Sequence, residues 1–119
     1  MDLITGGAYQ GKRTYAMKPF SVSEEDIFCC SEDAPCDFTA GCIDHLENYV
    51  LYCVKNHLEP AMDFRSDAVL IGRDISCGVV PTDPLIRRYR EVYGRYLQTL
   101  AARCDSVTRM FCGLPQKLK

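Results

Sequence analysis

The sequence contains no long apolar run, no excess of basic residues and no cysteine pair in C-x-x-C spacing. Its apolar runs extend over only a few residues, whereas a membrane-spanning helix needs about 20, so we expect no membrane span. A formal net charge of −2 offers no basic surface to a phosphate backbone, which argues against nucleic acid as a partner. The chain also opens without a basic segment followed by an apolar one. We therefore expect no secretory signal and a cytoplasmic protein.

Eight cysteines are nevertheless present, and in a reducing compartment they stay as thiols that pack like small apolar residues. Cys42, Cys53, Cys104 and Cys112 lie in apolar segments, which predicts core positions. The acidic stretch "EEDIFCCSEDAPCD" holds Cys29, Cys30 and Cys36, and it invites either a zinc or redox site or a solvated loop. Because their spacing fits no metal-binding pair, the solvated loop is the favoured interpretation.

The 119 residues, 47% of them apolar, are typical of one globular domain covering residues 1–119. Strand signals alternate with helix signals along it, which favours a parallel sheet with helices on both faces. We expect strands at 1–5, 38–44, 67–72 and 106–112, and a loop of roughly twenty residues before the second of these.

Two helices are predicted after the second strand. Apolar residues recur at three-four spacing from Leu46 to Leu58, and Pro60 closes that helix. The segment 82–104 is the clearest helix, with Asp83 as its N-cap and Pro84 at its first position. Its expected buried stripe is Leu85, Ile86, Tyr89, Val92, Tyr93, Tyr96, Leu97, Leu100 and Cys104.

The glycine-rich stretch "GGAYQGKRTYA" lies between the first strand and the helix expected after it. Gly6, Gly11 and Lys12 fit the phosphate-binding pattern G-x-x-x-x-G-K-[ST], in which backbone N–H groups and the lysine hold phosphates. Arg13 stands where a magnesium-binding hydroxyl belongs, so Thr14 or other groups would have to replace it. A glycine-rich turn with a solvated lysine is the alternative.

The chain resembles the cobinamide kinase / cobinamide-phosphate guanylyltransferase family of corrinoid biosynthesis. That family opens with a strand, "GGA" and "GK", and later carries a loop ending in V-P, a helix with R-x-[FY]-R-[DE], and a tail containing G-x-P. The matching residues are Gly6, Gly7, Ala8, Gly11, Lys12, Gly78, Val79, Val80, Pro81, Arg87, Arg88, Tyr89, Arg90, Glu91, Gly94, Gln98, Leu100 and Ala101. More than half of the chain takes part in the resemblance.

This resemblance implies a P-loop NTPase-like α/β fold with a reduced parallel sheet of about four strands. It implies a nucleotide site at Gly6, Gly7, Ala8, Gly11, Lys12, Arg13 and Thr14, and a corrinoid-binding loop with Ser76, Gly78, Val79 and Pro81. Lys12 and Asp74 take catalytic places, with Asp74 as a second metal contact or a base. Asp44 takes the place of a Mg²⁺-associated aspartate. Alternatively, Asp44 caps the following helix and Asp74 caps a turn.

The chain departs from the family in one long segment. Between the phosphate loop and the Asp44 strand, the family carries a further strand, an arginine-rich helix and the histidine that accepts the guanylyl group. Residues 19–36 are too few for these, and neither His45 nor His57 aligns with that histidine.

Two hypotheses follow from the sequence. One is a kinase that uses ATP or GTP to phosphorylate adenosylcobinamide or a similar acceptor. The other is a degenerate protein that binds a nucleotide, phosphate or corrinoid, or pairs with another subunit, without chemistry. Loss of the middle segment should expose apolar edge surface, which predicts a homo-oligomer. For the sheet we predict the strand order last, first, "DAVLIG", "CID".

Overall fold

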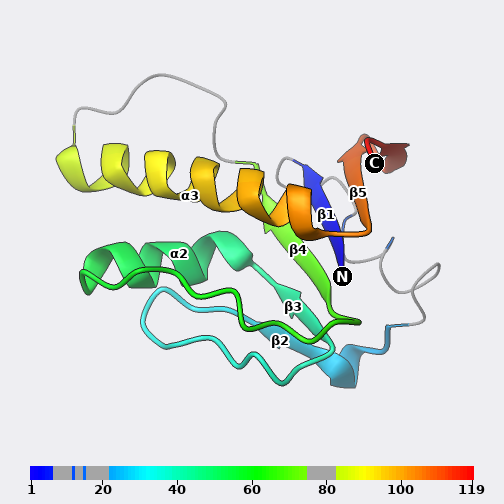
Figure 1. The fold of residues 1–119 in the computed structure, drawn as a ribbon, viewed down its shortest axis with the longest axis horizontal. Coiled ribbons are helices and arrows are strands. Elements are labelled where there is room, and N and C mark those ends of the chain that lie inside the picture. Colours follow the sequence, from blue (N-terminus) through cyan, green and yellow to red (C-terminus); the bar gives the residue numbers. More distant parts are fainter. Residues whose placement is uncertain (7–11, 13–14, 16–21, 75–82) are drawn as a thin grey trace.

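A computed structural model describes residues 1–6, 12, 15, 22–74 and 83–119 of the chain. They form one mixed sheet, packed against two long helices (Figure 1). The strands are β1 (Asp2–Gly6), β2 (Ile27–Cys29), β3 (Cys42–Asp44), β4 (Val69–Arg73), β5 (Ser106–Phe111) and β6 (Leu114–Lys117). The helices are α2 (Leu46–Lys55) and α3 (Pro84–Arg103), and a short 3-10 turn covers Glu24–Asp26. None of the described helices is long and apolar enough to span a membrane.

The sheet has the order β2-β3-β4-β1-β5-β6. Its four inner strands, β3, β4, β1 and β5, are parallel and follow the order predicted from the sequence. Leu3 of β1 pairs with Leu70 of β4 on one side and with Val107 of β5 on the other. The opening strand is therefore in the interior of the sheet, as expected for an α/β fold of the P-loop type.

Strand β2 was not expected, because the sequence predicts a loop of roughly twenty residues in this region. Ile27–Cys29 pairs in parallel with β3 at the edge of the sheet. The strand has only three residues and follows an acidic turn, so it shows neither the length nor the alternation that identifies strands in a sequence.

Strand β6 was also missed, and it is the antiparallel partner of β5. Cys112 and Gly113 join the two strands with φ values of 52° and 75°. Positive φ at both positions is the geometry of a type I′ hairpin turn, which matches the twist of paired strands. The prediction that Cys112 is a core residue is wrong, because the turn leaves it exposed, whereas Cys42, Cys53 and Cys104 are buried as expected.

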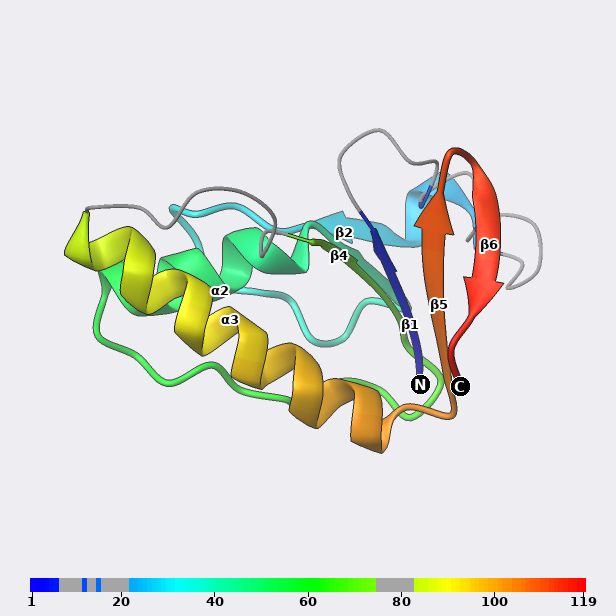
Figure 2. The same ribbon diagram turned by 90° about the horizontal axis from the view of Figure 1, so that it is seen from above.

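Helices α2 and α3 lie side by side on one face of the sheet, as both ribbon views show (Figure 2). Leu3, Ile43, Leu70 and Val107 share one row of the sheet and point toward these helices, which contribute Leu46, Val50, Tyr93 and Leu100 among others. This is the larger core. The buried stripe predicted for helix α3 is confirmed at Tyr89, Tyr93, Tyr96, Leu100 and Cys104. Leu85, in the first turn of α3, is exposed.

The opposite face of the sheet has a smaller core of Ile4, Cys42, Val69, Ile71 and Met110. Tyr15, whose backbone is helical, packs against it together with Val22 and Ile27. This is the region in which the sequence predicts a helix after the glycine-rich stretch.

Helix α2 ends earlier than predicted. His57 has a φ of 55°, its N–H donates to the Val54 carbonyl, and the Leu58 N–H donates to the Cys53 carbonyl. These two bonds form a Schellman motif, which satisfies the last carbonyls and stops the helix before Pro60. Leu58 consequently lies beyond the helix and is exposed, so its predicted place in the buried stripe is wrong.

Helix α3 begins as predicted. The Asp83 carboxylate accepts a hydrogen bond of 2.8 Å from the Leu85 N–H, and Pro84 occupies the first helical position. Further along, the Tyr96 hydroxyl donates to the Ala61 carbonyl, while the Tyr49 hydroxyl of α2 accepts from the Ala61 N–H. One tyrosine from each helix thus hydrogen-bonds to the backbone of the segment that connects α2 to β4.

Candidate functional site

The candidate site lies where the parallel strands β1, β3 and β4 end. Gly6 is the last residue of β1, Asp44 is the last of β3, and Asp74 follows β4. The Asp74 N–H donates a 2.7 Å hydrogen bond to the Gly6 carbonyl, so the start of the glycine-rich stretch and Asp74 are held together. In α/β folds this edge of the sheet is where ligands bind.

Several residues that the sequence assigns to this site lie outside the described residues. They are Gly7, Ala8, Gly11, Arg13 and Thr14 of the glycine-rich stretch, and Ser76, Gly78, Val79 and Pro81 of the later loop. The site is therefore built here from Gly6, Lys12, Asp44 and Asp74, and from the side chains around them.

Asp44 is buried, with 5% of its surface exposed, and its carboxylate accepts a 2.7 Å hydrogen bond from the His45 N–H. Helix α2 begins immediately afterward, with His45 as its N-cap residue at a φ of 55°. Capping of α2 by Asp44 was the alternative role for this carboxylate. The bond that the structure shows goes to the adjacent N–H, and the N-cap side chain itself makes no capping bond.

Glu47 is the residue that the sequence interpretation missed. It lies in the first turn of α2, is only 6% exposed, and accepts a 2.9 Å hydrogen bond from the Arg73 N–H of β4. Its second oxygen lies 3.2 Å from His45 Nδ1. In the sequence, Glu47 is only a carboxylate next to the apolar stripe of α2. Acidic residues are common in the exposed first turn of a helix, so this pattern did not indicate burial.

Lys12 lies close enough to Glu47 and Asp44 for both carboxylates to act on its charge. Burial lowers the pKa of the Lys12 ammonium, and the two carboxylates oppose that shift without cancelling it. The lysine expected to hold phosphates is therefore partly desolvated beside two buried acids. A desolvated ammonium interacts more strongly with an anion than one in bulk water does.

The end of β4 is fixed from the α3 side by Tyr93. Its hydroxyl donates a 2.7 Å hydrogen bond to the Arg73 carbonyl, and burial raises the pKa of that phenol far above its usual range. A Cβ at Gly72 would approach the same hydroxyl to 2.6 Å, so glycine is required there by the tyrosine. Arg73 is thus bonded through its N–H to Glu47 and through its carbonyl to Tyr93.

The side chains around Asp44 offer few ligands for a divalent cation. Among the described residues, no three His, Cys, Asp or Glu side chains gather in a way that could hold a metal ion. Both oxygens of Glu47 are already engaged, by Arg73 and His45. However, Mg²⁺ in phosphate sites takes only one or two carboxylates and completes its shell with water and phosphate oxygens. Asp44 fits that limited role.

The acidic stretch is largely exposed, as the solvated-loop interpretation predicts, but two of its three cysteines are shielded from solvent. Cys30 is buried and its Sγ lies 3.8 Å from that of the partly buried Cys36. The Cys30 N–H also donates to the Asp44 carbonyl, which extends the pairing of β2 with β3 by one residue. Only Cys29 of the three is exposed.

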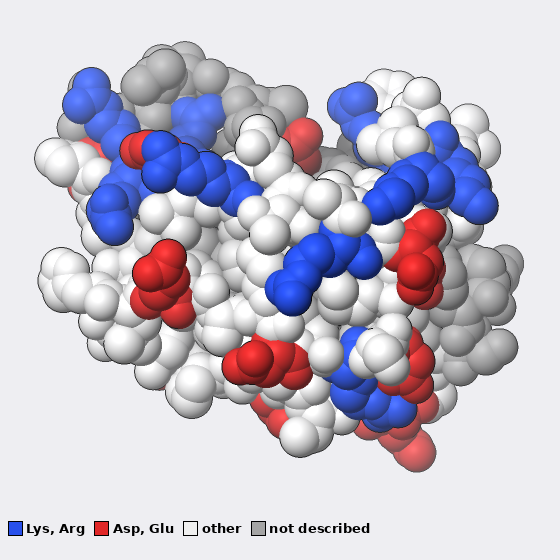
Figure 3. Space-filling view, viewed as in Figure 1, with Lys and Arg blue, Asp and Glu red and all other residues white. Residues whose placement is uncertain are grey.

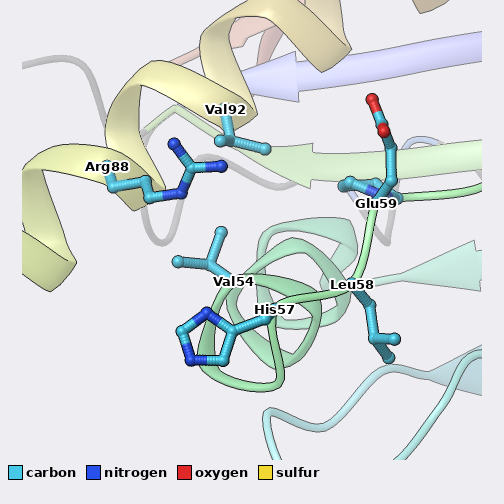
Figure 4. A pocket seen from close by; sticks show the side chains of 7 residues that line it. Val54, His57, Leu58, Glu59, Arg88 and Val92 are labelled. Carbon is cyan, nitrogen blue, oxygen red and sulfur yellow. The ribbon is translucent and has the colours of Figure 1, made fainter.

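A cavity of about 280 Å³ lies between the C-terminal end of α2 and the first turns of α3. Arg88 and Val92 of α3 lie on one side of it, and Val54 and His57 lie on the other (Figure 4). His45 lies at the other end of α2, about 15 Å away for a ten-residue helix. The two histidines therefore belong to different parts of the molecule, and only His45 is beside the candidate site.

Glu47 should be a larger contributor to stability than a typical helix-surface acid. Replacing Glu47 by alanine removes the acceptor of the Arg73 N–H and the partner of His45, so we expect the free energy of unfolding to fall by about 1–3 kcal/mol. Urea unfolding measures the change. Glu91→Ala is the matched control, since Glu91 pairs with Arg95 on the exposed face of α3 and should contribute less than about 0.5 kcal/mol. Equal losses in the two variants would contradict the assignment.

Comparison with known proteins identifies the family that this chain resembles. The family model for cobinamide kinase / cobinamide phosphate guanyltransferase matches residues 24–118. Over 51 residues the chain is 41% identical to the bifunctional adenosylcobalamin biosynthesis protein CobP of Pseudomonas aeruginosa, and 37% identical to the corresponding protein CobU of Salmonella typhimurium. Each match covers 43% of this chain but only 30% and 28% of those relatives.

The family match begins after the glycine-rich stretch, so it is independent of Gly6 and Lys12. It includes β2 to β6, both long helices, and the candidate-site residues Asp44, Glu47 and Asp74. The parallel inner strands and the helices packed on them agree with the fold that the resemblance implies. The chain belongs to the cobinamide kinase / cobinamide phosphate guanyltransferase family.

Proposed function

We propose that the protein binds a nucleoside triphosphate and transfers its terminal phosphoryl group to a hydroxyl of adenosylcobinamide or a similar corrinoid. The observation that supports this proposal is that Lys12 lies within electrostatic reach of Asp44, while Asp74 is bonded to Gly6, all near the carboxyl ends of parallel strands. Phosphoryl transfer depends mainly on positioning and on neutralising charge, so few protein groups are required.

Each of these residues has a role in the proposed reaction. Lys12 pairs with the outer phosphates, helped by backbone N–H groups of the glycine-rich stretch. Asp74 accepts the proton of the acceptor hydroxyl, whose oxygen then bonds to the γ-phosphorus as the bond to the nucleoside diphosphate breaks. Asp44 would contribute one oxygen to a Mg²⁺ ion, which neutralises phosphate charge when bound. Whether ATP or GTP is used depends on contacts with the base.

The guanylyltransferase half of the family's chemistry is not part of the proposal. His45 is directed to Glu47 and is 53% exposed, while His57 terminates α2 at the other end of that helix. The contact with Glu47 gives the His45 ring a structural role, whereas at His57 it is the backbone that makes the bond ending α2. We further propose that the chain functions in the cytoplasm as a homo-oligomer in which each copy carries a nucleotide site.

The second candidate function is binding without catalysis. Arg13 occupies the place of the magnesium-binding hydroxyl, which is a departure from the phosphate-binding pattern at the reacting end of the site. A degenerate member that binds a nucleotide, phosphate or corrinoid would retain Lys12 without needing Asp74.

Turnover distinguishes these candidates. With [γ-³²P]ATP or GTP, Mg²⁺ and adenosylcobinamide, we expect label to appear in the corrinoid, and Asp74→Asn to slow that transfer while leaving nucleotide affinity unchanged. With [α-³²P]GTP we expect no acid-labile adduct on the protein. Transfer absent under all conditions, with nucleotide still bound, would select the binding function. A stoichiometric adduct on His45 or His57 would show that the guanylyl step survives.

A further inference from the structure

A cavity of about 440 Å³ lies on the α3 side of the sheet, between that helix and the carboxyl ends of β1, β4 and β5. We call it the α3 cavity. Its polar lining consists of Thr5, Asp74, Arg90, Gln98 and Arg109, with Gly94 between the two α3 side chains. In the space-filling view the surface is indented between the part over α3 and the part over the β5–β6 hairpin (Figure 3).

Two elements that are distant in the sequence present these groups to the same space. Arg90, Gly94 and Gln98 recur every fourth residue, which places them on one stripe of α3. Thr5 of β1 and Arg109 of β5 are register partners on the same face of the sheet as Leu3. The cavity is therefore built by a regular helix face opposite a regular pair of strands.

No contact with the described residues requires glycine at position 94. A Cβ there would meet none of their heavy atoms within 4 Å, and the φ of Gly94 lies outside the positive range, so alanine would fit. Glycine in the middle of a 20-residue helix is nevertheless unfavourable, because it costs backbone entropy. Because glycine has no side chain, it leaves open space in the lining of the α3 cavity between Arg90 and Gln98.

The charges of the lining define the class of ligand. Arg90 and Arg109 bring two guanidinium groups, against the single carboxylate of Asp74, and the Gln98 amide and Thr5 hydroxyl add further donors. Guanidinium groups match the geometry of phosphate and carboxylate oxygens. We propose that the α3 cavity is a second anion site, separate from the phosphate loop, that holds a phosphate monoester or carboxylate group of a ligand.

The position of Asp74 connects this site to the candidate catalytic site. Asp74 lines the cavity, and its N–H is bonded to the Gly6 carbonyl where the glycine-rich stretch begins. The α3 cavity and the candidate catalytic site therefore share Asp74. If the proposed phosphoryl transfer holds, on which this assignment rests, the anchored group is the phosphate monoester of the phosphorylated product.

Amide resonances of ¹⁵N-labelled protein, followed during titration with inorganic phosphate, test the site without any turnover. We expect saturable shifts of Gly94 and Gln98 in the wild type and equally in Lys12→Ala. Arg109→Gln should weaken these shifts at least tenfold in affinity, because one of two guanidiniums is lost. Arg95→Gln removes the same charge from α3 outside the cavity, where Arg95 pairs with Glu91, and should leave the affinity unchanged.

Gly94→Ala gives a second test, in which stability and phosphate affinity are expected to change in opposite directions. Since alanine favours the helix, its melting temperature should rise by about 4 °C, while phosphate affinity falls as the methyl group enters the cavity. Absence of shifts at millimolar phosphate, their loss in Lys12→Ala, or equal weakening by Arg95→Gln and Arg109→Gln would each overturn the proposal. Failure of phosphoryl transfer with these shifts intact would instead count against the proposed function alone.

Discussion

Replacing Gly6 by alanine is expected to lower the free energy of unfolding by about 3 kcal/mol, through backbone strain and overpacking together. Gly6 ends β1 with a φ of 150°, which residues with a side chain rarely adopt. A Cβ there would also lie 2.5 Å from the carbonyl oxygen of Met110, a backbone atom of the neighbouring strand β5. Neither strand can move away, because both are interior to the sheet. Urea unfolding of the variant measures the loss.

Gly113→Ala separates the two causes. Gly113 has a φ of 75° in the β5–β6 turn, but a Cβ there would meet nothing within 4 Å. The control therefore carries strain without a clash and should lose only about 1 kcal/mol. If Gly6→Ala is no more destabilised than Gly113→Ala, the close approach of β1 and β5 does not limit the residue at position 6.

Replacing Lys12 by alanine is expected to weaken nucleotide binding by about 1.5–3 kcal/mol, the scale of a hydrogen bond to a charged group. The loss corresponds to a roughly tenfold to 150-fold higher Kd. Calorimetric titration with ATP and with GTP, each with and without Mg²⁺, measures it. Lys55→Ala is the control, since Lys55 pairs with Glu32 and Asp33 at the end of α2.

Arg13 should make this binding less dependent on magnesium. A guanidinium at position 13 can pair with a phosphate oxygen and supply part of the charge that the metal would bring. Arg13→Ser, which restores the hydroxyl of the pattern, should then increase the effect of Mg²⁺ on the Kd. Unchanged affinity in Lys12→Ala, or no triphosphate binding by the wild type at millimolar concentration, would mean that the glycine-rich stretch is a relic.

The inner sheet could be predicted because its signals are local. The strands that contain Leu3, Ile43, Leu70 and Val107 are short apolar runs between turns or helices, and the resemblance supplied their order. The α3 start was predictable for the same reason, since Asp83 and Pro84 act within one turn of the helix. The two edge strands were missed because pairing, rather than composition, makes three or four residues into a strand.

The site was predictable only as far as its motif residues. Asp44 ends one predicted strand and Asp74 follows another, so their position at one edge of the sheet could be inferred from the sequence. Glu47 could not, because its importance comes from the N–H of Arg73, which is 26 residues away and faces it only in the folded chain. The Tyr93–Gly72 contact escaped prediction in the same way, since it depends on how closely α3 packs over β4.

The short strands at the two ends of the sheet have a consequence for aggregation. An open sheet edge is a template on which another chain can add a strand, and natural proteins limit this with short strands, proline and lysine. Strand β2 exposes three residues of edge, and β6 carries Pro115, which has no N–H to donate, and Lys117. Sheet extension between copies is therefore disfavoured at both edges. If this chain forms oligomers, we expect their contacts to lie away from these two edges.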